Sequence, residues 1–66
     1  MALATFNAST RIATIRQDNG EVEEKTISGP LSPEAATSLL AEAGWKPAGD
    51  LQDKGNGIFE MAISAL

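Results

Sequence analysis

Residues 31–45 read LSPEAATSLLAEAGW, the only stretch of the chain in which both ends of a helix are marked. Ser32 suits the N-cap, because its side-chain oxygen can accept a hydrogen bond from a free amide of the first turn. Pro33 suits the first helical position, where no N–H is needed. Gly44 can take the left-handed conformation that ends a helix, and Pro47 forbids continuation. The sequence therefore predicts one short helix that begins after Ser32 and ends at Gly44.

The apolar positions of this helix form a narrow stripe of small and medium side chains. They recur at the three- and four-residue spacing that places side chains on one helical face: Ala36, Leu39, Leu40 and Ala43. A helix of about 12 residues is marginal in water by itself. We therefore expect it to lie across one face of a sheet, with its backbone close to the strands.

Strand patterns flank the helix on both sides. Residues 2–16 (ALATFNASTRIATIR) and 21–28 (EVEEKTIS) precede it, and residues 45–51 (WKPAGDL) and 58–66 (IFEMAISAL) follow it. Their β-branched and alternating apolar residues favour strands over further helices. The pattern predicts a single small α+β domain spanning residues 1–66, ordered ββαββ, with one helix packed on one face of a mainly antiparallel sheet.

Two local features of the N-terminal half bear on strand pairing. Within residues 2–16 the alternation of apolar residues changes its phase, because Ala4 and Phe6 have even numbers whereas Ile15 has an odd number. This change predicts a bulge or break near residues 7–10. Asn and Gly accept the positive φ of tight turns, so Asn19-Gly20 predicts a hairpin with a two-residue loop.

That two-residue loop would place Arg16 opposite Glu23, a favourable pair of opposite charges. The second strand is rich in charge, which suits a sheet edge. The last strand is apolar on both faces, which suits the middle of a sheet. We therefore expect the strand order 2-1-4-3, with Phe59, Met61 and Ile63 facing the helix. One helix covers one face only, so a second protomer or another protein is expected to cover the other.

Composition excludes several classes of function. The net charge is −4, from 5 basic and 9 acidic residues, which argues against nucleic acid and anionic membranes as partners. The chain has no cysteine and no histidine, so it lacks disulfides, the usual zinc ligands and both Ser/His/Asp and Cys/His nucleophile systems. It also has neither a signal-peptide pattern nor a long apolar run. We expect a cytoplasmic protein.

The acidic residues do not form a recognisable catalytic or metal-binding pattern. Several of them fall in expected turns and on the charged strand, away from the kind of cleft that shifts the pKa of a catalytic carboxyl. A calcium loop starting at Asp50 would place Lys54 and Met61 at positions that require oxygen ligands. We therefore predict no catalytic, metal-binding or cofactor-binding residues, and no enzyme activity.

These observations predict a small non-enzymatic protein-interaction module that forms a homodimer or higher oligomer, or binds another protein. Chains this short bury little core and often gain stability by association. Compact acidic proteins without catalytic residues include bacterial and phage inhibitors and accessory factors, and we interpret the chain as one of these. The predicted partner-binding residues are Trp45, Leu51, Ile58 and Ala62.

Two alternatives remain open at this point. Trp45 can act either as an interface anchor or as the largest core side chain, packed with Phe6 and Phe59. A second function is a nucleic-acid-binding module that uses a small basic patch on the first hairpin, formed by Arg11, Arg16 and Lys25. The acidic residues of the same hairpin and its lack of aromatic residues argue against the second function.

Overall fold

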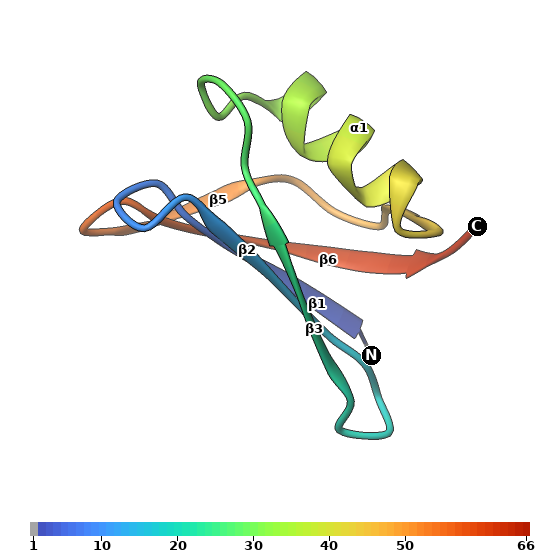
Figure 1. The fold of residues 1–66 in the computed structure, drawn as a ribbon. Helices are drawn as coiled ribbons and strands as arrows, with labels where there is room; N and C mark the ends of the chain where they lie inside the picture. Colours follow the sequence, from blue (N-terminus) through green and yellow to red (C-terminus); the bar gives the residue numbers. More distant parts are fainter. Residues whose placement is uncertain (1) are drawn as a thin grey trace.

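An antiparallel sheet with one helix on one of its faces makes up the fold (Figure 1). The computed structural model describes residues 2–66. Its elements, in chain order, are β1 (Ala2–Asn7), β2 (Ile12–Arg16), β3 (Val22–Thr26), α1 (Pro33–Glu42), β4 (Trp45–Pro47), β5 (Gln52–Gly55) and β6 (Ile58–Ala65). The predicted α+β class and the single helix on an antiparallel sheet are confirmed. The strand count is higher than predicted, because the predicted strand of residues 2–16 is divided into β1 and β2, and β5 lies beyond the predicted strand of residues 45–51.

The first interruption is a chain reversal between β1 and β2. The Asn7 side-chain oxygen accepts hydrogen bonds from the amides of Ser9 and Thr10, at 2.9 and 3.1 Å. The Arg11 amide donates to the Asn7 carbonyl at 2.8 Å, and Arg11 has a φ of 59°. These bonds turn the chain so that β1 and β2 pair as a hairpin. The change of phase therefore marks a break between two strands.

The turn between β2 and β3 has three residues instead of the predicted two. The Gly20 amide donates to the Gln17 carbonyl at 3.0 Å, and the Gln17 amide donates to the Glu21 carbonyl at 2.8 Å. Gly20 has a φ of 89°. This is a tight turn closed by a left-handed glycine, a common three-residue hairpin loop. The positive φ falls on the glycine alone.

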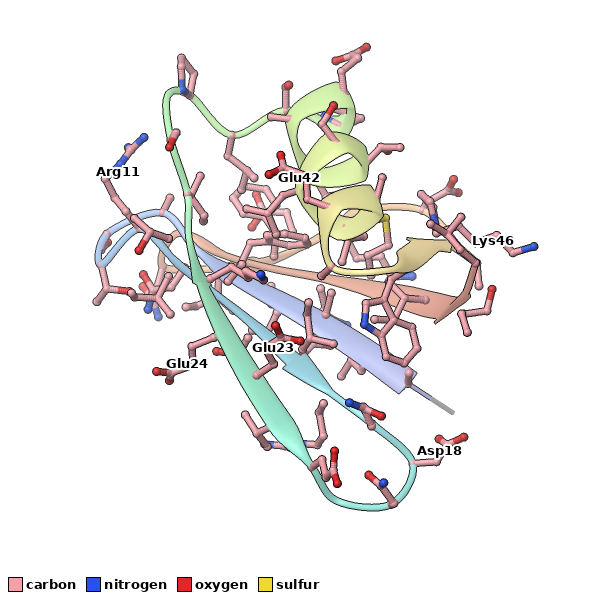
Figure 2. All side chains as sticks on the ribbon, turned by 45° about the vertical axis from the view of Figure 1, so that its right-hand side comes forward. Arg11, Asp18, Glu23, Glu24, Glu42 and Lys46 are labelled. Carbon is pink, nitrogen blue, oxygen red and sulfur yellow. The ribbon has the colours of Figure 1, made fainter. Side chains whose placement is uncertain are left out.

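The extra loop residue shifts the pairing of β2 and β3 by one position. Arg16 lies opposite Val22, so the predicted Arg16–Glu23 pair is wrong. A one-residue shift moves every side chain of a strand to the other face. Glu23 and Lys25 therefore lie on the helix side of β3, where they form an ion pair at 3.4 Å. Glu24 points away from them on the opposite side (Figure 2).

The sheet has the order β3-β2-β1-β6-β4, and β5 also pairs with β6. This is the expected order 2-1-4-3, with the first predicted strand divided into β1 and β2 and with β5 added beside β6. β4 and β5 pair with successive parts of β6, with Lys46 opposite Ser64 and Gln52 opposite Glu60. The charged β3 lies at an edge and β6 lies inside the sheet, as their compositions predict.

Helix α1 forms where its end signals predict. The Ser32 hydroxyl accepts from the Ala35 amide at 3.1 Å, and Gly44 follows the helix with a φ of 90°. The Gly44 carbonyl accepts a hydrogen bond from the amide of Leu66, which links the end of the helix to the end of the chain. Ala36 and Leu40 are the buried residues of the helix.

The core lies between α1 and the sheet. Its largest fully buried side chains are Phe6, Ile15 and Leu40. Met61 and Ile63 are buried on the same side, so the predicted inward face of the last strand is confirmed. The remaining buried core residues are small or lie beyond the strands: Ala2, Ala4, Ala13, Ile27 and Ala36.

Candidate interaction surface

No helix or strand of residues 2–66 lies over the sheet face opposite α1 (Figure 1). The connection between β4 and β5 borders this face, with Gly49 beside the Ala62 side chain. Side chains alternate between faces along a strand, and directly paired residues share a face. The register therefore assigns the side chains of this surface, which we call the open face. Its residues are Leu3, Thr5, Asn7, Ile12, Thr14, Arg16, Val22, Glu24, Thr26, Lys46, Gln52, Ile58, Glu60, Ala62 and Ser64.

Three rows of these side chains cross the strands. The middle row is polar and consists of Glu24, Thr14, Thr5, Glu60 and Gln52. The row beside the β2–β3 turn consists of Val22, Arg16, Leu3 and Ala62. The row at the other end consists of Thr26, Ile12, Asn7 and Ile58. The polar middle row thus separates the other two rows. Apolar residues predominate in the row beside the β2–β3 turn, and they alternate with polar residues in the row at the other end.

The open face carries five aliphatic side chains among its fifteen residues. Each of β1, β2, β3 and β6 places at least one aliphatic side chain on it. Val22 is 54% exposed, and Leu3, Ile12, Ile58 and Ala62 are only half-buried. Antiparallel sheets with one wet face usually alternate apolar residues inward with polar residues outward. These five outward aliphatic side chains depart from that alternation.

Charges on the open face are distributed unevenly. Glu24 lies on the β3 edge, whereas Lys46 and Lys54 lie on the opposite edge, formed by β4 and β5. Asp50 also lies at that edge, where it lines a shallow hollow with Gln52 and Glu60. Arg16 on β2 and Glu60 on β6 lie between the edges. Lys54 contacts Glu60 at 3.9 Å, a long and exposed ion pair. Such a pair contributes little to stability, so both groups can exchange partners at small cost.

The four predicted partner-binding residues do not form one surface. Ile58 and Ala62 lie on the open face, as partner binding requires. Trp45 and Leu51 are half-buried and pack against the core. A shallow hollow of about 470 Å³ lies beside Trp45 and is lined also by Gln17. The indole therefore contributes to packing at this end of the sheet.

A groove that the sequence did not predict lies between α1 and β3. Ile27, Leu31 and Leu39 give it apolar walls, and Lys25 and Glu42 lie on its lining. Its volume is about 260 Å³, below the range of about 300–1,000 Å³ that ligand pockets occupy. The groove depends on the shifted register of β3, which the sequence pattern did not reveal.

The three cations of the alternative basic patch are separated in space. Arg11 lies at the β1–β2 turn, and its guanidinium donates to the carbonyl of Gly29, in the connection between β3 and α1. Arg16 lies near the other end of β2 on the open face, and Lys25 lies on the helix side of β3 beside Glu23. Figure 2 shows Arg11 at the opposite side of the molecule from Lys46. The structure therefore does not bring these cations together in one patch.

Comparison with protein-family models, curated proteins and solved structures finds no match for this chain. Within residues 2–66, no group of three His, Cys, Asp or Glu side chains is arranged to hold a metal ion. None of the helices in that range is both long and apolar enough to cross a membrane.

Proposed function

We propose that this chain is a small non-enzymatic interaction module that associates with a second copy of itself through the open face. The observation that carries the proposal is the set of outward aliphatic side chains on a sheet face that no element covers. Apolar surface of this kind on a small protein commonly marks an interaction site. Packing a second sheet on the open face would remove these side chains from water.

The small core gives a physical reason for self-association. The chain has no cysteine for a disulfide, and its buried side chains include several alanines. Domains of this size usually gain only a few kcal/mol from a single core. A sheet-on-sheet dimer would convert the half-buried side chains of the open face into a second core layer.

The interface would be small and the dimer reversible. The longest dimension of the molecule is 27 Å, and the open face spans less than that. It therefore offers less than the about 800 Å² per partner of a standard interface. We expect a dissociation constant on the order of micromolar, at the weak end of the range for specific complexes.

The proposal keeps the expected setting of a cytoplasmic accessory or inhibitor protein of a bacterium or phage. Composition and small size are the support for this setting. Nucleic-acid binding stays an untested alternative without a supporting patch. It would weaken steeply with salt, whereas association through aliphatic side chains would not.

Sedimentation equilibrium from about 1 µM to about 1 mM protein tests the proposal, because this range brackets a micromolar dissociation constant. We expect the average mass to rise from monomer towards dimer. Ile12→Lys places a charge on the open face and should keep the mass at the monomer value. The matched control is Ala41→Lys on the exposed side of α1, which should dimerise like the wild type. A monomeric wild type at every concentration would refute the proposal.

A further inference from the structure

We infer that the two copies pack face to face about a twofold axis parallel to β1. β1 then lies over β1 of the second copy, β2 over β6, and β3 over β5. This inference rests on the proposed function, because it specifies the geometry of the same open face. Three observations support it: the order of charges across the sheet, the position of Arg16, and the matching of aliphatic side chains.

The order of charges across the sheet selects this axis. An axis perpendicular to the strands that passes through the middle row would place β3 over β3 and β6 over β6. Glu24 would then oppose Glu24 of the second copy, and Glu60 would oppose its own counterpart. Like charges opposite one another in an interface cost free energy and exclude such an arrangement. An axis parallel to β1 instead places the β3 edge, with Glu24, over the β5 edge, where Gln52, Lys54 and Asp50 lie.

Arg16 finds an opposite charge in this arrangement. β2 lies over β6 of the second copy, so Arg16 lies over Ala62, one row away from Glu60. Neighbouring same-face residues along a strand are about 7 Å apart, a distance that the long arginine side chain can span. Arg16 forms no ion pair within residues 2–66 and is exposed, so it is available for this contact. The twofold axis makes the Arg16–Glu60 contact occur twice.

The aliphatic side chains also meet one another. Leu3 on β1 lies near the axis and faces Leu3 of the second copy. Ile12 faces Ile58 of the second copy, because these two residues lie in one row on either side of β1. Aligned sheets pack about 10 Å apart and about 30° from parallel, a spacing that lets such side chains interdigitate. In this arrangement the open face therefore places aliphatic side chains against aliphatic side chains and Arg16 near Glu60.

Exchanging the two charges tests the inference. Arg16→Glu and Glu60→Arg, each alone, should raise the dissociation constant at least about tenfold, because each juxtaposes like charges at two symmetric contacts. The double variant Arg16→Glu/Glu60→Arg should return it to within about threefold of the wild type, because the pairs are restored with their signs reversed. The matched control exchanges Glu23 and Lys25 on the helix side of β3 and should leave the dissociation constant unchanged.

The outcomes separate this inference from the proposed function. Circular dichroism melts first establish that each variant is folded. If the wild type dimerises but the double variant stays as weak as the single variants, the axis is wrong and the proposed function stands. The same holds if neither single variant changes the dissociation constant. If the wild type is monomeric throughout, both proposals fail.

Discussion

At the scale of single residues, the loop between β2 and β3 decides which side chains reach the open face. The sequence pattern identified the turn but gave its loop two residues instead of three. The positive φ of Gly20 and the hydrogen bonds of Gln17 show that the loop has three residues. An Asn-Gly sequence fits both two-residue and three-residue hairpin loops, so the sequence alone did not give the loop length. The shift moved Glu23 and Lys25 to the helix side and Glu24 to the open face.

Met61 provides a residue-scale test of the two sheet faces. Its side chain is 5% exposed and packs in the core on the helix side. Met61→Asp would bury a charge without a partner, which costs several kcal/mol, and we expect the domain to unfold. The matched control is Ser64→Asp, on the open face of the same strand, which should remain folded. Circular dichroism and thermal melts measure both, and a folded Met61→Asp variant would show that the faces are assigned wrongly.

At the scale of elements, the helix and the break after β1 were predictable, whereas the additional strand β5 was not. Ser32, Pro33 and Gly44 signal the helix ends through local chemistry, so sequence alone located them. The break between β1 and β2 left only a change of phase in the apolar alternation, because Asn7 forms the turn through its own side chain. β4 and β5 are short and pair only with β6, a tertiary context that their composition does not encode.

The N-cap of α1 gives the element-scale prediction. Ser32→Ala removes the acceptor for the Ala35 amide and should lower the free energy of unfolding by about 1 kcal/mol. Urea denaturation measures this loss. Ser38→Ala, on an exposed position of the same helix, should change the free energy of unfolding by less than about 0.5 kcal/mol. Equal losses for the two variants would contradict a specific capping role for Ser32.

At the scale of the whole molecule, the strand order followed from two simple properties. A charged strand belongs at an edge and a doubly apolar strand belongs inside, and β3 and β6 occupy those positions. Part of the candidate surface followed as well, because Ile58 and Ala62 come from the outward face of the last strand. Leu3 and Ile12 were not identified as surface residues, because their assignment requires the register of β1 with β2.

The central claim is that a second copy covers the open face, and methyl NMR on a dilution series tests it most directly. Methyl signals report the surroundings of individual side chains, so they distinguish the two faces of one sheet. We predict that the methyl signals of Leu3, Ile12, Val22 and Ile58 shift with protein concentration, whereas those of the buried Ile15 and Leu40 do not. Open-face signals that stay constant up to about 1 mM, far above a micromolar dissociation constant, would contradict the claim.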